Sequence, residues 1–176
     1  MPNKKNNKTV IALTGATGFV GKRFIEIALQ MKMEVRALTR RPQVSMKGVT
    51  WIEGDLNNKT ALGHLVKDID TVIHMAGVVK ALNWGGFKEV NIIGTRNLIE
   101  AFKKNQPNKS KKSHFIYISS ITARVPWLSY YGASKRLSEN ELEKISGHTI
   151  LRPPAIYGPG DTEILTMFKA FKSGFA

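Results

Sequence analysis

The segment "TVIALTGATGFVG" (residues 9–21) decides the fold class. An apolar run ends at Gly15, and two more glycines follow at three-residue intervals, Gly18 and Gly21. Between a strand and a helix, the first glycine of such a set permits a tight turn. The second lets backbone amides approach a pyrophosphate, and the third lets the helix pack closely. The helix dipole then favours the anion. The segment therefore predicts dinucleotide binding; the alternative is an ordinary glycine-rich turn without a ligand.

Beyond this segment, short apolar runs alternate with longer runs of helical periodicity. Strands are predicted at 9–15, 34–39, 49–55, 70–77, 114–120 and 148–154. Helices are predicted at 19–33, 59–69, 87–105, from 129 through 139, and at 162–174. Such alternation implies right-handed crossovers and a parallel sheet covered on both faces. We therefore expect a Rossmann-type doubly wound α/β domain over 9–176, a three-layer α/β/α arrangement with about six strands. A basic flexible tail at 1–8 precedes it.

Composition and charge limit the partners of the 176-residue chain. It has no cysteine, and its four histidines fall on separate predicted elements, so no metal site is expected. No run approaches the roughly 20 apolar residues of a membrane span, and a signal-peptide pattern is absent, so we expect a cytoplasmic protein without membrane contact. The net charge is +14, but the lysines of the tail and of 103–114 have no interleaved aromatic residues. Nucleic-acid binding is therefore the weaker interpretation, and the charge also suits a phosphate-bearing cofactor.

The end of the second predicted strand bears on the choice of dinucleotide. An acidic residue there would bind the ribose hydroxyl of NAD, but the strand ends in Thr39, Arg40 and Arg41. A guanidinium fits a 2′-phosphate better than a neutral hydroxyl. NADP(H) is therefore favoured, with Arg40 as the contact. NAD(H) is the alternative, in which the arginines face water. Asp55 could accept a hydrogen bond from the adenine amino group.

The segment "SYYGASKRLSE" (129–139) places Lys135 one helical turn after Tyr131. A free tyrosine titrates near pH 10, and a neighbouring ammonium would lower its pKa. Tyr130 has Ser134 at the corresponding position, so Tyr131 is the better acid/base candidate. "YISS" ends the fifth strand with two serines that could orient a substrate oxygen. The alternative is an ordinary surface pair on a helix.

Together these motifs resemble the short-chain dehydrogenase/reductase superfamily, and most closely its extended branch, the NAD(P)-dependent epimerase/dehydratase family. The motifs that carry the resemblance, in order, are "TGATGFVG", "GDL", "HMAG", "NIIGTRNLIEA", "ISS", "YGASK" and "LRPPAIYGPG". The resemblance covers the chain from Val10 to about Phe171. It implies an NAD(P)(H)-dependent oxidoreductase or epimerase that moves a hydride at a hydroxyl or carbonyl carbon of a small molecule. It also implies a homodimer formed through the long helices.

The resemblance implies a role for each matched position. Ser120, with Ser119 as the alternative, orients the substrate oxygen; Tyr131 is the acid/base and Lys135 its partner. Asn91 supports the site from its helix. The residues expected around the cofactor are Gly15, Ala16, Thr17, Gly18, Phe19, Val20, Gly21, Arg40, Asp55, Leu56, Ala76, Gly77, Lys80, Asn91, Tyr131, Lys135 and Pro153.

Three departures from the family pattern affect the functional expectation. The family continues into a substrate-binding portion after the sixth strand, most of which is missing here. Ala155 stands where nucleotide-sugar enzymes often have an asparagine, and the interval from Ser120 to Tyr131 is short. The last two features favour a reductase or dehydrogenase over a nucleotide-sugar epimerase or dehydratase. The first keeps a non-catalytic NADP(H)-binding module as a further alternative.

Overall fold

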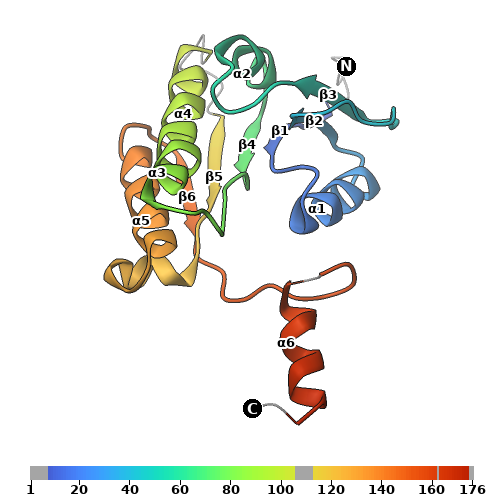
Figure 1. The fold of residues 1–176 in the computed structure, drawn as a ribbon. Coiled ribbons are helices and arrows are strands. Elements are labelled where there is room, and N and C mark those ends of the chain that lie inside the picture. Colours follow the sequence, from blue (N-terminus) through green and yellow to red (C-terminus); the bar gives the residue numbers. More distant parts are fainter. Residues whose placement is uncertain (1–7, 106–112, 162, 175–176) are drawn as a thin grey trace, which may run out of the picture.

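The computed structural model describes residues 8–105, 113–161 and 163–174, and its centre is a six-stranded sheet (Figure 1). The strands are β1 (Val10–Thr14), β2 (Glu34–Thr39), β3 (Val49–Glu53), β4 (Thr71–His74), β5 (His114–Ile118) and β6 (His148–Leu151). All neighbours pair in parallel, in the order β3-β2-β1-β4-β5-β6. The predicted doubly wound fold is confirmed. The order reverses between β1 and β4, and ligands bind at such a switch point in open α/β sheets. Most of the predicted tail at 1–8 lies outside the described residues.

The helices divide unequally between the two faces of the sheet (Figure 1). They are α1 (Phe19–Gln30), α2 (Lys59–Leu65), α3 (Trp84–Phe87), α4 (Gly94–Lys104), α5 (Tyr130–Leu142) and α6 (Glu163–Lys172). One core packs α2, α4 and α5 against the sheet through residues such as Leu62, Leu98 and Phe115. A smaller core under α1 contains Leu13 and Ile25. The helix α6 stands away from the sheet at the end of a long connection.

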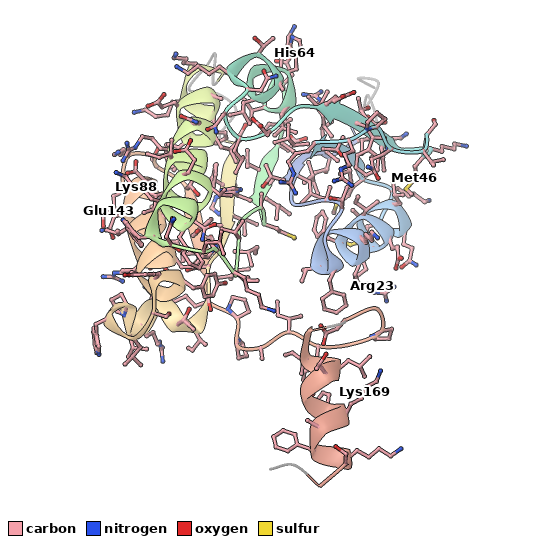
Figure 2. The ribbon with its side chains drawn as sticks, in the orientation of Figure 1. Arg23, Met46, His64, Lys88, Glu143 and Lys169 are labelled. Carbon is pink, nitrogen blue, oxygen red and sulfur yellow. The ribbon has the colours of Figure 1, made fainter. Side chains whose placement is uncertain are left out.

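Surface properties of the described residues agree with a spread positive charge. The labelled cations Arg23, Lys88 and Lys169 lie on well-separated parts of the molecule (Figure 2). They belong to α1, to the helical segment that precedes α4, and to α6. Within the described ranges, no helix is long and apolar enough to cross a membrane.

Four strands end two or three residues earlier than their apolar runs predict. Their last residues are Glu53, His74, Ile118 and Leu151. Gly54, Met75 and Ser119, the first residues after β3, β4 and β5, still donate to a neighbouring strand, and the chain then turns into loops at the carboxyl edge of the sheet. For example, Asp55 Oδ1 accepts hydrogen bonds from the backbone amides of Asn57 and Asn58, at 2.8 and 3.1 Å. The shortening therefore supplies the loops that form the candidate site.

The helix predicted at 87–105 is not a single α-helix. It begins earlier, at Trp84, where Asn83 Oδ1 caps it by accepting from Gly86 N at 3.2 Å. Residues Lys88–Ile93 form a π-helical segment before α4 begins. Single π turns inside helices are often found at functional sites. Here the π segment contains Asn91, which is 1% exposed.

Two 3₁₀ turns that the sequence did not predict connect β5 to α5. They are Ile121–Arg124 and Pro126–Leu128. Ser129 follows them as the N-cap of α5, with its hydroxyl accepting from Gly132 N at 3.0 Å. These turns set the position from which α5 presents Tyr131.

Candidate active site

A cleft of about 340 Å³ opens at the carboxyl edge of the sheet, beside the β1–β4 switch point. Predicted cofactor residues that line it are Gly15, Thr17, Gly18, Arg40, Asp55, Leu56, Ala76 and Gly77. Residues that sequence reasoning missed are Leu38, Thr39, Gly54, Asn57, Met75, Val78, Glu89 and Val90. The volume and the backbone-rich lining suit the adenosine and diphosphate portion of a dinucleotide.

The glycine loop is shaped by close backbone contacts. Gly15 has φ +76°, and a Cβ there would lie 2.8 Å from Ala76 N, so only glycine fits. A Cβ on Gly21 would lie 2.1 Å from Gly15 O, so α1 packs directly on the turn itself. Gly18 is the N-cap of α1, and its amide donates to Gly15 O at 3.1 Å. Gly18, at the start of α1, lines the cleft, and no side chain caps the first amides of the helix.

The remaining predicted residues of this loop are set back from the cleft. Ala16 is buried in the core under α1. Phe19 and Val20 are half-buried on the first turn of α1. The ring of Phe19 faces the connection after β6, where a Cβ on Gly158 would be 3.8 Å from it. These residues position the loop and do not line the cleft.

One exposed guanidinium lines the cleft, at the end of β2. Arg40 lines the cleft directly after β2. Its neighbour Arg41 helps to close the turn, since Thr39 Oγ1 donates to Arg41 O at 2.7 Å. The carboxylates that line the cleft, Asp55 and Glu89, come from other elements. Glu89 Oε1 accepts from the Asn57 side chain at 3.1 Å.

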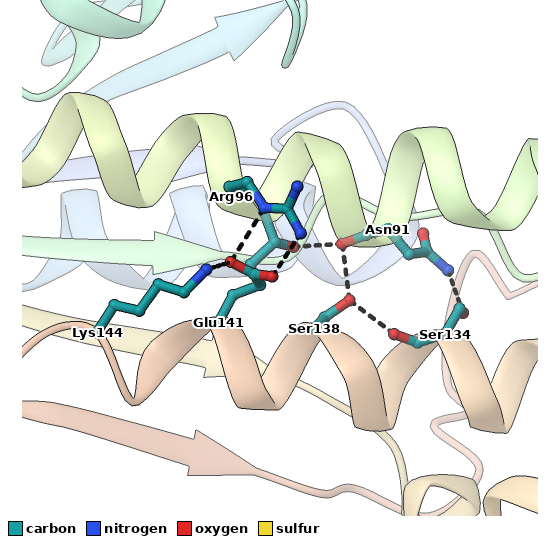
Figure 3. A network of polar contacts seen from close by, with 7 residues as sticks. Asn91, Arg96, Ser134, Ser138, Glu141 and Lys144 are labelled. Atoms are coloured by element: carbon teal, nitrogen blue, oxygen red, sulfur yellow. Dashed lines mark hydrogen bonds and ion pairs between the residues drawn. The ribbon is translucent and has the colours of Figure 1, made fainter.

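The side chain of Asn91 holds the loop after β4 by hydrogen bonds. Its Oδ1 accepts from Val78 N at 2.8 Å, and its Nδ2 donates to Val78 O at 3.0 Å and to Ser134 Oγ at 2.9 Å. Ser138 Oγ donates to Asn91 O at 2.7 Å (Figure 3). Further along the same helices, Glu141 of α5 holds Arg96 of α4 with contacts of 2.8 and 3.2 Å. The predicted supporting position of Asn91 is thus a clamp between the cleft loop and α5.

His74 belongs to the candidate site, and the sequence did not predict it. It is fully buried at the end of β4, with Thr14 Oγ1 at 2.6 Å from Nδ1 and Thr95 Oγ1 at 2.9 Å from Nε2. Burial and the charge of Lys135 lower the pKa of His74 to about 3. Thr14 Oγ1 also accepts from Ala76 N at 3.2 Å. A neutral imidazole therefore braces the cleft loop.

Tyr131 and Ser120 meet where α5 begins beside the end of β5. A hydrogen bond from Ser120 lowers the pKa of the Tyr131 phenol, but the larger effect is burial, which raises it. Thr122 Oγ1 donates to Ser120 Oγ at 2.9 Å. Phe87 lies against the phenol ring, at 6.4 Å between centroids. The structure thus brings the predicted acid/base and serine together.

Lys135 does not have the effect on Tyr131 that the sequence led us to expect. The ammonium is 4% exposed, donates to Ile118 O at 2.7 Å, and lies 4.3 Å from the centroid of the Tyr117 ring. Burial lowers the pKa of Lys135 to about 7, and the charge of Glu139 opposes this. Burial raises the pKa of Tyr131 and a hydrogen bond from Ser120 opposes this, so the lowering expected from Lys135 is absent.

The two serines of "YISS" have different partners. Ser119 Oγ donates to Glu139 Oε1 at 2.6 Å. Glu139 also holds Arg152 by two contacts of 2.8 and 2.7 Å. Ser119 is therefore committed to a buried ion pair that ties α5 to the end of β6, whereas Ser120 faces Tyr131.

Two predicted residues lie at the margin of the site, outside the cleft. Pro153 O accepts from Ile121 N at 2.9 Å, which joins the end of β6 to the turn after Ser120. Lys80 is exposed on the loop after β4. Among the described residues, no group of three or more histidine, aspartate or glutamate side chains could hold a metal ion.

Comparison with known proteins identifies the family. A family model described as the NAD dependent epimerase/dehydratase family matches residues 11–174. Ceramide reductase of Caulobacter vibrioides is 41% identical over 165 residues, which cover 91% of this chain and 50% of that protein. A 2-alkyl-3-oxoalkanoate reductase of Stenotrophomonas maltophilia is 29% identical over 182 residues, covering 88% and 53%. The chain spans about half the length of these relatives.

Solved structures also match this chain. MoeE5 in complex with UDP-glucuronic acid and NAD matches with a TM-score of 0.75 at 25% identity, over 92% of this chain and 60% of that one. The predicted resemblance is confirmed: this chain belongs to the NAD dependent epimerase/dehydratase family.

Proposed function

We propose that the chain forms the cofactor-binding and proton-transfer part of an NADP(H)-dependent oxidoreductase. Bound NADP(H) would supply or accept the hydride at a carbonyl or hydroxyl carbon. The observation that carries the proposal is the contact between Ser120 and Tyr131 at the end of β5, on the same sheet edge as the cleft. Relatives named as reductases support this direction of chemistry.

The residues of the cleft fit such a cofactor. Gly15 and Gly21 keep the loop free of side chains at points where a Cβ would clash, so backbone amides can face a diphosphate. Arg40 at the adenosine end suits a 2′-phosphate. NAD(H) is the alternative, supported by MoeE5, which has NAD bound.

The raised pKa of Tyr131 suits donation of a proton. The phenol keeps its proton at neutral pH, so in the reducing direction it can give that proton to the substrate oxygen as C=O becomes CH–OH. Ser120 would hold the same oxygen. The phenolate left behind would regain its proton from water, and in the oxidising direction the same transfers run in reverse.

Two alternatives come from specific observations. A nucleotide-sugar epimerase or dehydratase is suggested by MoeE5, whose complex contains UDP-glucuronic acid, but Ala155 stands where such enzymes often have asparagine. A non-catalytic NADP(H)-binding module is suggested because the chain spans only about half the length of its relatives.

The test is a pair of matched tyrosine variants. NADPH binding is measured by fluorescence, and NADPH consumption is measured with 2-decanone. UDP-glucose is tested with NADP+, and formation of NADPH is followed. Tyr131→Phe should bind NADPH as the wild type does but turn over about 100- to 10,000-fold more slowly. Tyr130→Phe, which keeps the aromatic ring and removes only the hydroxyl, should bind NADPH as the wild type does and turn over at least about tenfold faster than Tyr131→Phe. Binding without turnover in the wild type would favour the module, and absence of NADPH binding would overturn the proposal.

A further inference from the structure

Exposed apolar side chains flank both Ser120 and Tyr131. Ile121 directly follows Ser120, and Tyr130 directly precedes Tyr131. Between them, Trp127 is 77% and Leu128 is 72% exposed. The exposed side chains of this group, here called the apolar rim, are Ile121, Val125, Trp127, Leu128 and Tyr130. Single exposed apolar residues need no explanation, but a contiguous group beside a reactive site indicates a binding surface.

The apolar rim is held in a defined shape. Both 3₁₀ turns carry backbone hydrogen bonds, from Val125 N to Thr122 O and from Leu128 N to Val125 O, each at 3.1 Å. The rings of Trp84 and Tyr130 lie 5.8 Å apart, which joins the start of α3 to the start of α5. The apolar side chains are therefore presented by ordered backbone and are not a frayed segment.

Two hydroxyls of the same segment already have hydrogen-bond partners. Thr122 Oγ1 donates to Ser120, and Ser129 Oγ accepts the capping amide of α5. Arg124 is the one charged side chain between Ser119 and Tyr131. A sugar diphosphate would need several donors here for its hydroxyls and phosphates. The segment offers apolar area instead.

We propose that the apolar rim binds the aliphatic chain of the substrate. The substrate would then be an oxo or hydroxy compound with a long alkyl group, its oxygen placed at Tyr131 and Ser120 and its chain along the rim. This inference rests on the proposed function, which assigns Tyr131 and Ser120 to that oxygen. It adds the substrate class, which the cleft does not specify.

The test measures ligand affinity in the presence of saturating NADPH, by calorimetric titration of the whole chain with 2-butanone, 2-hexanone, 2-decanone and UDP-glucose. Affinity should rise about two- to fourfold for each added methylene, as expected for apolar surface that leaves water. UDP-glucose should bind more weakly than 2-decanone. Equal affinity along the ketone series, no ketone binding, or preference for UDP-glucose would each overturn the inference.

A matched pair of variants locates the effect. Leu128→Ser should weaken 2-decanone binding about three- to tenfold and leave NADPH affinity unchanged. Val44→Ser, an exposed aliphatic position on the β2–β3 connection, should change neither. If the wild type does not bind NADPH, the proposed function is wrong. Normal NADPH binding with no dependence on chain length would count against this inference alone.

Two other occupants of the apolar rim give distinct results. If Leu128→Ser releases the chain from phosphatidylglycerol vesicles and leaves 2-decanone affinity unchanged, the rim binds membrane and the inference is wrong. If it dissociates a dimer seen by light scattering, again with unchanged ketone affinity, the rim binds a second copy and the inference is equally wrong.

Discussion

The cleft and the group of Ser120, Tyr131 and Lys135, here called the Tyr131 site, lie on the same sheet edge but are constructed differently. At the glycine loop, the cleft is shaped by backbone at residues without side chains, as at Gly15 and Gly21. The Tyr131 site is made of side chains held by buried partners, as Lys135 is by Ile118 O. The cleft therefore depends on positions that have no side chain, and the Tyr131 site depends on buried hydrogen bonds. Substitutions that fill space should damage the first, and those that remove a partner should damage the second.

The largest effect is expected at Asn91, the residue that joins the two sites. Asn91→Ala removes the partners of Val78 N and O and of Ser134, and should lower the free energy of unfolding by about 2–4 kcal/mol, as measured by urea denaturation. Asn97→Ala, on α4, loses a partly buried bond to Leu56 O and an exposed bond to Asn57 Oδ1, and should cost less than about 1.5 kcal/mol. Equal losses would show that Asn91 is not a clamp.

Filling space should harm the cleft first. Gly21→Ala places a Cβ against Gly15 O, which should destabilise the chain by about 1–3 kcal/mol and weaken NADPH binding measured by fluorescence. Gly63→Ala is the matched control, because a Cβ there meets nothing within 4 Å on α2. It should stabilise by about 0.5–1 kcal/mol. Unchanged NADPH affinity in Gly21→Ala would separate the glycine loop from cofactor binding.

The buried histidine predicts a dependence of stability on pH. The pKa of His74 is about 3 in the folded chain and about 6.5 in an unfolded one. Between these values the unfolded chain binds more protons, so stability is lost as pH falls from about 6.5 towards about 3. The contribution is at most about 1.4 kcal/mol per pH unit.

Urea denaturation at several pH values between about 6.5 and 5, above most carboxylate titration, measures this slope. His74→Gln should flatten it, even though the variant is less stable overall. His64→Gln, at an exposed position of α2, should keep the wild-type slope. A wild-type slope in His74→Gln would assign the dependence to other groups.

The smallest effect concerns the choice of cofactor. Arg40→Ser should weaken NADPH binding about tenfold, the loss of a charge-assisted contact worth about 1.5–3 kcal/mol before solvent screening. NADH binding should be unchanged. Arg41→Ser should alter neither, since Arg41 lies outside the cleft lining. Equal losses of NADPH and NADH affinity in Arg40→Ser would remove the 2′-phosphate from the explanation.

The fold and the shape of the cleft were predictable because their signals are local. Strand–helix alternation and glycine spacing are patterns within short stretches of sequence. A Cβ at Gly15 would clash with the loop after β4, and a Cβ at Gly21 would clash with the glycine loop itself. The predicted cofactor residues include Phe19 and Val20, which stand between the glycines, but in the structure both are set back from the cleft. Glu89 and Val90 were missed because the π segment that brings them to the cleft has no clear sequence signal.

The residues of the Tyr131 site could be predicted from the sequence, but their pKa values and hydrogen-bond partners could not. Tyr131 and Lys135 share a helix face, which the spacing alone indicates. Where the ammonium points depends on a carbonyl in β5 and a ring above it, which no local pattern contains. Likewise, Ser119 and Ser120 look equivalent in sequence, and only the tertiary position of Glu139 and Arg152 separates them. His74 was missed for the same reason, since both of its partners lie on other elements.

The π segment at 88–93 has one further consequence, for how this chain can vary in length. Removing one residue from it would restore α-helical register and rotate Asn91 by about 100° relative to α4. The carboxamide would then turn away from Val78, and α5 would lose its tie to the cleft loop. A single-residue deletion in this segment should therefore weaken the tie between α5 and the cleft loop, which urea denaturation of the deletion variants can measure.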